Sequence, residues 1–187
     1  MRLLVLAILL ALTGCEQGTG FVHGERLEID DCGDSVSWEP FDMSLEFLGV
    51  VRATDVVMLR ASATSQWPDR TDSLLVQVAS HENVREQLAE LGAATLEVNA
   101  GDVAIGLSLM GRCPDSVTPL VAMNGTVVFS ELGTVGGDQV TGTLTFDLFD
   151  QRSGELVGVD FEAALDFEVM SGTPFELFSD VSRQHGE

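Results

Sequence analysis

The feature that most constrains the fold is a strict alternation of side-chain character in two neighbouring segments. Apolar residues or glycine occupy every second position from residue 140 to 148, and apolar residues do so again from 157 to 169. A period of two is typical of a β-strand that buries one face. The intervening residues 152–155 include Gly154, which adopts positive φ without strain. The pattern therefore predicts an antiparallel hairpin.

The length of this loop also predicts the register of the hairpin. If the two strands pair directly on either side of residues 152–155, Phe146 faces Phe161 and Leu144 faces Ala163. All four side chains then lie on the core side. A slip by one residue would place core residues opposite outward ones, so this register is the one we expect.

Shorter runs of the same kind fill much of the remaining sequence. Alternating or Val- and Leu-rich segments occur at 43–47, 55–63, 73–79, 94–99, 102–110 and 125–130. They are separated by Gly, Pro, Asp and Asn, which favour turns. We expect a tight turn at Asn124–Gly125–Thr126 and a hairpin turn at 133–138.

One segment has the period of a helix instead. Ser80 can cap it, Gly92 can end it, and Val84, Leu88 and Leu91 form one apolar stripe. The segment is therefore predicted to be a short surface helix at about 80–91 that lies on a sheet.

These patterns together predict a mainly β fold. We expect an antiparallel β-sandwich or a barrel-like Greek-key domain with one short surface helix. The sequence contains no internal repeat and no domain linker. Residues 25–187 are therefore predicted to form a single β-rich domain.

The first fifteen residues have a different character. Arg2 is followed by an apolar run at 3–12, which as a helix would span about 15 Å, half of a hydrocarbon core of about 30 Å. That length suits a signal peptide rather than a membrane span. The run ends in Leu12-Thr13-Gly14-Cys15, which resembles the lipobox of bacterial lipoproteins.

The resemblance implies that residues 1–14 are a signal peptide and that Cys15 becomes the lipidated first residue of the mature chain. Its acyl chains, palmitate among them, would each contribute about 0.8 kcal/mol per buried methylene. Residues 15–24 would carry the lipid and act as a tether. Glu16 after the cysteine implies outer-membrane rather than inner-membrane localisation in the cell envelope.

Two further cysteines, Cys32 and Cys113, remain in the mature chain. An exported protein with two such residues is expected to join them in a disulfide. Closing a loop of about 80 residues is worth roughly 4 to 5 kcal/mol in the chain-entropy model. The alternative is a pair of free thiols.

The charge balance excludes several classes of protein. The chain has 30 acidic residues against nine arginines, a net charge of −21, and neither lysine nor tyrosine. Nucleic acid is an unsuitable partner, because phosphate binding needs a basic surface. Without lysine there is no P-loop lysine and no Schiff base. An acidic surface that serves only solvation is the simplest interpretation.

The hairpin carries the strongest candidate for a ligand site. The predicted register places Asp147 directly opposite Asp160 on the outer face, with Glu162 beside them. Like charges that face each other across two strands are destabilising, and a calcium ion bound by these three residues would relieve the repulsion. The alternative is a solvated acidic face without metal.

Other motifs are weaker candidates for functional sites. In the loop at 65–70, Trp67 and Arg70 have the character of contact residues for a binding partner. His81 begins the sequence HENVR, which resembles a zinc-protease motif, but Arg85 stands where the second histidine is required. His81 is therefore interpreted as a helix-start residue. The sequence contains no recognisable set of catalytic residues.

We therefore expect a lipid-anchored cell-envelope protein with a non-catalytic binding or structural domain. Its partners would be the membrane, through the anchor, and an envelope protein. A calcium-dependent binding module that uses the acidic hairpin face is the first alternative. A hydrolase that uses carboxylates alone is the second. No cofactor other than calcium is expected.

Overall fold

The computed structural model describes residues 18–29, 32, 36–64, 70–114 and 119–169. The predicted signal peptide, Cys15 and the loop residue Trp67 lie outside these ranges. The described chain contains eleven strands and one helix. They are β1 (Gly18–Ile29), β2 (Val36–Trp38), β3 (Phe41–Leu45), β4 (Phe47–Ala53), β5 (Val56–Ser62), β6 (Asp72–Val78), α1 (His81–Leu91), β7 (Ala94–Glu97), β8 (Val103–Leu109), β9 (Leu120–Leu132), β10 (Gln139–Phe149) and β11 (Leu156–Glu168).

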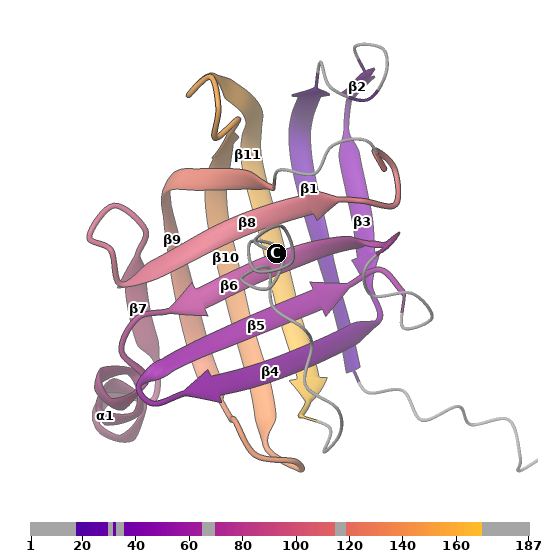
Figure 1. Ribbon diagram of the computed structural model, residues 1–187. Helices are drawn as coiled ribbons and strands as arrows, with labels where there is room; N and C mark the ends of the chain where they lie inside the picture. Colours follow the sequence, from indigo (N-terminus) through magenta and orange to yellow (C-terminus); the bar gives the residue numbers. More distant parts are fainter. Residues whose placement is uncertain (1–17, 30–31, 33–35, 65–69, 115–118, 170–187) are drawn as a thin grey trace, which may run out of the picture.

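All the strands belong to one antiparallel sheet that bends over itself without closing. Neighbouring strands follow the order β2-β1-β11-β10-β9-β8-β6-β5-β4, while β3 also pairs with β1 and β7 with β9. The long strands β1, β9, β10 and β11 form one layer, and β4, β5, β6 and β8 cross it in a second (Figure 1). The predicted sandwich-like antiparallel fold with one short helix is confirmed.

The chain passes from one layer to the other at two bends. Strand β3 pairs with β1, whereas β4, which begins after the single residue Glu46, pairs with β5. The backbone N–H of Glu46 donates to the carbonyl of Ser62 at 2.9 Å and holds this bend against β5. At the other bend, β8 joins β9 through only two residue pairs. The apolar faces of the two layers therefore turn toward each other.

Phenylalanine side chains fill much of the space between the layers. Those exposed by less than 2 % are Phe41, Phe129, Phe161 and Phe167. The ring centroid of Phe161 lies 5.6 Å from that of Phe41 and 5.6 Å from that of Phe146. Gly24 on β1 makes this packing feasible, because a Cβ at Gly24 would lie 2.5 Å from the Phe161 ring.

The predicted hairpin is confirmed in its core half. Strands β10 and β11 pair with Leu144 opposite Ala163 and Phe146 opposite Phe161. The side chains of all four residues are buried, as the alternation requires. Between Phe146 and the loop the ladder then shifts twice, so the prediction that the strands pair directly on either side of residues 152–155 is wrong.

This shift changes the relation between the two facing aspartates. Asp147 and Asp160 are not a ladder pair, because the first shift falls at this point. Asp160 adopts φ 52°, and its backbone N–H donates to Oδ1 of Asp147 at 3.0 Å. Aspartate is among the few residues that tolerate a left-handed conformation. The bulge buries Gly158 and leaves Val157 and Val159 half-buried, so the predicted inward alternation is wrong at 157–159. The apolar pattern of the sequence continues through the bulge and therefore did not reveal it.

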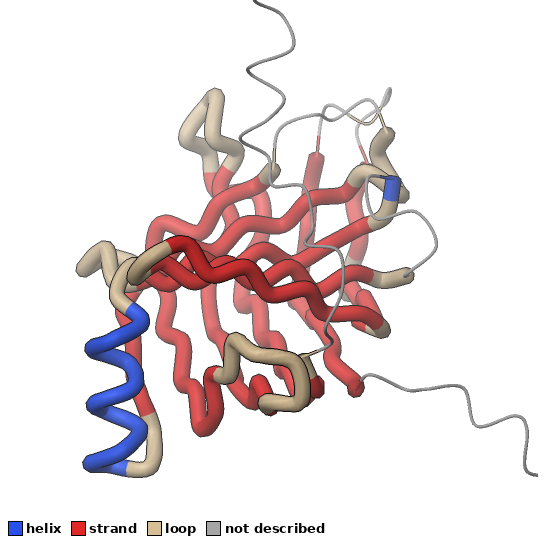
Figure 2. The backbone as a smooth tube through the Cα atoms, turned by 60° about the horizontal axis from the view of Figure 1, so that its bottom comes forward, coloured by secondary structure: helices blue, strands red, loops and turns tan. Residues whose placement is uncertain are grey.

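Helix α1 has the predicted bounds, but the Ser80 side chain does not cap it. It follows Ser80 and stops at Gly92, whose φ is 73° and whose N–H donates to the carbonyl of Leu88 at 3.0 Å. Val84 is buried and Leu88 half-buried where the helix packs on β7 and β9 (Figure 2). Leu91 is 75 % exposed, so its predicted place in the apolar stripe is wrong. Only the N-terminal part of the helix packs closely on the sheet.

No helix of the described residues is long and apolar enough to cross a membrane.

The first strand begins earlier than the sequence predicts. Strand β1 starts at Gly18, inside the segment 15–24 that we expected to be a tether. From Gly18 to Gly24 it pairs with β11, from Phe167 back to Phe161. Its glycines reduce the propensity for a strand, but the ladder and the buried side chain of Val22 override this preference. Only three residue steps separate Cys15 from the sheet.

The predicted turn at Asn124–Gly125–Thr126 is also wrong. These residues lie within β9, where Gly125 adopts φ 140° and faces Phe146 on β10. A Cβ at Gly125 would lie 2.5 Å from the carbonyl oxygen of Thr145. Glycine is needed here for the close approach of two strands rather than for chain reversal. The turn at 133–138 joins β9 to β10 as predicted.

Candidate functional site

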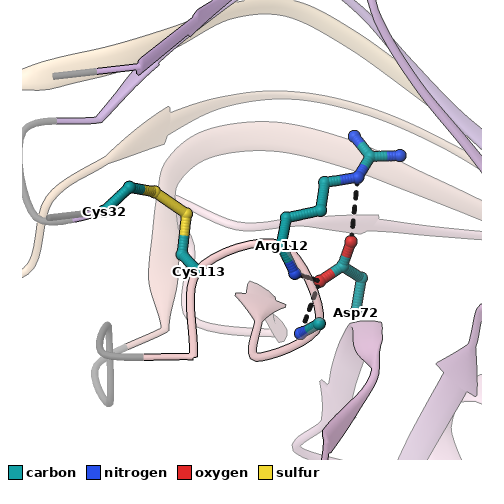
Figure 3. Close-up of a disulfide and its surroundings, with 5 residues drawn as sticks. Cys32, Asp72, Arg112 and Cys113 are labelled. Carbon is teal, nitrogen blue, oxygen red and sulfur yellow. Dashed lines mark hydrogen bonds and ion pairs between the residues drawn. A yellow bond between two sulfur atoms is a disulfide. The ribbon is translucent and has the colours of Figure 1, made fainter. Parts of the chain in front are cut away.

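The predicted disulfide joins Cys32 to Cys113, whose Cα atoms lie 4.9 Å apart (Figure 3). Beside it, the buried carboxylate of Asp72 accepts hydrogen bonds from the backbone N–H groups of Gly111 at 2.9 Å and Arg112 at 3.1 Å. The Nε of Arg112 lies 3.0 Å from the same carboxylate. These contacts fix the loop that carries Cys113.

Arg112 is fully engaged in this cluster. Its guanidinium also donates to the carbonyl of Asp42 at 2.5 Å and stacks on Phe41, 4.6 Å from the ring centroid. A buried carboxylate paired with arginine and with two backbone donors is electrostatically satisfied. The cluster is therefore structural, and it leaves no group directed at a ligand.

The three residues predicted to bind calcium line one surface depression. Asp147, Asp160 and Glu162 surround it together with Asn124 and Thr145, and its volume is about 410 Å³. The depression is open to solvent and lies over the bulge of the hairpin. We call it the acidic depression.

Protein donors already occupy the central carboxylate of the acidic depression. Asp147 accepts the backbone N–H of Asp160 at 3.0 Å through Oδ1 and the side-chain amide of Asn124 at 3.2 Å through Oδ2. These bonds offset the repulsion between the two aspartates, which the sequence analysis expected a calcium ion to relieve. Within the described residues, no three His, Cys, Asp or Glu side chains converge as metal ligands. Calcium binding stays a prediction.

The predicted contact residues are only partly described. Arg70 is exposed and lies two residues before β6, whereas Trp67, the other predicted contact residue, is outside the described residues. No contact of Arg70 points to a ligand.

A second recess, which sequence reasoning missed, lies between β4, α1 and the turn that joins β9 to β10. Its volume is about 300 Å³. Its lining residues are Arg52, His81, Arg85, Leu132, Gly133, Thr134, Val135 and Asp138. We call it the basic recess. Arg52 comes from the end of β4, and His81 and Arg85 are four residues apart on one face of α1.

His81 is the unusual residue of the basic recess. Its side chain is buried, with 3 % exposure, and neither ring nitrogen makes a hydrogen bond of good geometry in the described chain, although the Leu132 carbonyl lies near enough to act on the ring. Burial lowers the pKa of His81, and the charge of Arg52 lowers it further; Arg85 acts in the same direction, whereas the Leu132 carbonyl opposes the shift. The imidazole is therefore neutral at neutral pH.

Asp55, in the turn between β4 and β5, caps the helix that carries His81. Its carbonyl accepts the N–H of His81 at 2.8 Å, and its Oδ1 accepts the N–H of Glu82 at 2.9 Å. The hydroxyl of Ser80 donates to Oδ2 of Asp55 at 3.1 Å and does not cap the helix. The prediction that Ser80 is the capping residue is therefore wrong. The bond from Glu82 lowers the pKa of Asp55, and burial opposes that shift.

The carboxylate of Asp138 is engaged on the opposite wall. Its Oδ2 accepts the backbone N–H groups of Thr134 at 3.2 Å and Val135 at 3.1 Å, which fixes the turn. Neither Arg52 nor Arg85 forms an ion pair with a carboxylate within the described residues, although the charge of Arg52 acts on Asp55. Arg52 donates through Nε to the carbonyl of Thr54 at 3.0 Å, and Arg85 makes no hydrogen bond or ion pair within the described residues.

The spacing of His81 and Arg85 on a helix was the only signal of this site in the sequence. Arg85 in place of the second histidine argues against a zinc-protease site. The spacing could not show that Arg52 and the turn at 133–138 lie beside these two residues. Comparison with known proteins adds no guide, because no family model, no curated protein and no solved structure matches this chain.

Proposed function

We propose that the chain is a lipid-anchored protein of the bacterial cell envelope and that its β-rich domain binds a partner or ligand without catalysing a reaction. The observation that carries the anchor is the lipobox-like sequence at 12–15, which ends in Cys15. The disulfide between Cys32 and Cys113 supports it, since such bonds persist in exported proteins and are rare in the reducing cytosol.

The short distance between Cys15 and β1 defines how such a protein would sit. Three residue steps separate Cys15 from Gly18, the first residue of the sheet. Fully extended, they reach no more than about 11 Å. A lipid at Cys15 would therefore hold the start of β1 close to the membrane surface, and the outer membrane is our proposed location.

Metabolic labelling with palmitate tests the anchor. The full-length chain is produced in a Gram-negative host, and label and membrane fractionation are followed. We expect the wild type to incorporate label and to sediment with membranes, and Cys15→Ser to do neither. The double variant Cys32→Ser with Cys113→Ser is the matched control and should keep the label. Equal labelling of Cys15→Ser and the wild type would refute the anchor.

Calcium-dependent binding is the alternative, because Asp147, Asp160 and Glu162 line one depression. It predicts that millimolar calcium raises the melting temperature of the full-length protein more than magnesium does, and that Asp160→Asn with Glu162→Gln abolishes the rise. Glu168→Gln, on the same strand but outside the depression, is the control. A carboxylate-based hydrolase has less support, because hydrogen bonds within the hairpin already hold the carboxylate of Asp147.

A further inference from the structure

We propose that the basic recess, formed by Arg52, His81 and Arg85, binds a phosphate-type oxyanion. Such a group occurs both as a free anion and in the headgroups of membrane lipids, and both would present the same oxygens to the site.

The first argument is the unsatisfied imidazole of His81. The great majority of buried polar side chains make hydrogen bonds, and leaving one unpaired costs roughly 1 to 3 kcal/mol. Both ring nitrogens of His81 are sealed from solvent without a well-formed hydrogen bond, and the Leu132 carbonyl is the one protein acceptor near the ring in the described chain. An oxyanion held by the arginines would reach a ring N–H only if the imidazole turned toward the recess that His81 lines, and it would then provide the stronger acceptor.

The second argument is the pair of arginines. The chain has only nine arginines against 30 acidic residues. Those at positions 26, 112 and 152 make ion pairs with carboxylates. Arg52 and Arg85 line the same recess without such a pair in the described chain. Planar guanidinium groups are suited to bidentate contacts with phosphate, so both arginines offer directed donors to an oxyanion.

Two carboxylates beside the site offset part of its positive charge. Asp55, in the turn between β4 and β5, interacts with the charges of Arg52 and His81, and its oxygens accept from Glu82 and Ser80. Asp138 lines the recess from the turn between β9 and β10, and its Oδ2 accepts from the backbone of that turn. Asp55 also accepts the first two backbone N–H groups of α1, those of His81 and Glu82. These N–H groups are therefore not free to bind the anion, which would be held by side chains.

The third argument is the position of the basic recess. Gly18, at the start of β1, pairs with Phe167, and Val169 exchanges hydrogen bonds with Gly137 and Asp138 in the turn that lines the recess. The start of β1, this turn and α1 thus lie at the same, lower end of the molecule in Figure 1. If Cys15 is lipidated, this end faces the membrane. Only the lipid source of the ligand rests on the proposed function.

Binding should be coupled to a proton. Arg52 and Arg85 disfavour a charged His81, together with burial. An anion that neutralises the arginines removes this repulsion and adds an attraction, so the bound state takes up a proton more readily than the free state. Affinity should therefore increase as the pH falls from 8 to 6.

The first experiment titrates the purified full-length protein, in neutral detergent, with sodium sulfate at constant ionic strength. Sulfate keeps its charge over this pH range, whereas phosphate does not. We expect a saturable rise in melting temperature and tighter binding at pH 6 than at pH 8. Arg52→Gln and Arg85→Gln should each weaken binding at least about tenfold, as expected for loss of a charge-assisted hydrogen bond.

Arg26→Gln is the matched control, because Arg26 is exposed on β1 and pairs with Glu28 outside the recess. It should bind sulfate as the wild type does. The proposal is wrong if chloride at equal ionic strength reproduces the rise, or if Arg26→Gln weakens binding as much as the recess variants.

A second experiment distinguishes the two sources of the ligand. Phenylglyoxal modifies exposed arginines, and mass spectrometry compares Arg85 with Arg26 in the same sample. Protection of Arg85 by inorganic phosphate in detergent identifies a free anion as sufficient. Protection only in vesicles of phosphatidylcholine with phosphatidylglycerol, and not in phosphatidylcholine alone, identifies a lipid headgroup. Absence of protection under all of these conditions would overturn the proposal.

Discussion

At the scale of single residues, the molecule contains two kinds of buried ionisable group. Asp72 is surrounded by donors and by the guanidinium of Arg112. His81 is buried to a similar extent but makes no hydrogen bond of good geometry in the described chain. The first arrangement stabilises the fold, whereas the second is a local cost of the kind found where a protein keeps a site ready for a ligand. Burial alone therefore does not separate structure from function.

His81 should make stability depend on pH. The pKa of His81 in the folded state lies below the usual histidine value of 6.5, so the folded state binds fewer protons than the unfolded state as the pH falls through 6.5. The free energy of unfolding should therefore decrease from pH 7.5 toward the folded pKa. Urea unfolding at pH 7.5 and 5.5, without added anions, should show a smaller difference for His81→Asn than for the wild type.

Val84→Ala on the same helix provides the control for this measurement. It removes buried apolar atoms but no titratable group, so it should lower stability and retain the pH dependence of the wild type. An unchanged pH dependence in His81→Asn would show that other groups are responsible.

At the scale of elements, some features of the strands and of the helix follow from the local sequence pattern and others do not. The alternation in β10 and β11 contains the core pairing of Phe146 with Phe161, since a one-residue slip would expose every core side chain. The stop of α1 at Gly92 is equally local, whereas its cap comes from Asp55 in a distant turn. The bulge at Asp160 is not local, because it follows from the contacts of Asp147 and Asn124 across three strands.

The basic recess could not be predicted for the same reason. Arg52 is at the end of β4, His81 is on α1, and Asp138 lies after β9. No spacing in the sequence reports that these segments meet. The prediction of a tether at 15–24 was wrong for another reason. The glycine-rich residues from Gly18 onward join the sheet because β11 and β3 pair with them on both sides.

Gly24 on β1 tests how tightly the two layers pack. A Cβ there would lie 2.5 Å from the Phe161 ring, which is itself enclosed by Phe41 and Phe146. Gly24→Ala should therefore destabilise the protein by about 1 to 3 kcal/mol, as overpacking does. Gly106→Ala on β8 is the control, because its nearest neighbour would be 3.4 Å away. Equal unfolding midpoints for the two variants would contradict this account.

At the scale of the whole molecule, the two layers are held together by the bends of the sheet and by the disulfide. Cys32 follows β1 in one layer, and Cys113 follows β8 in the other. The bond therefore links the two layers covalently. A net charge of −21 acts against the compact state, so a covalent link between the layers has a clear physical role.

Removal of the disulfide should be costly. The two cysteines are 81 positions apart, and a loop of this size confines the unfolded chain by roughly 4 to 5 kcal/mol in the chain-entropy model. Urea unfolding of Cys32→Ser with Cys113→Ser should show a loss of about 2 to 5 kcal/mol. Reduced wild-type protein should match this variant, since both lack only the cross-link. If the variant unfolds at the midpoint of the oxidised wild type, the bends of the sheet are sufficient and the disulfide does not stabilise the layers.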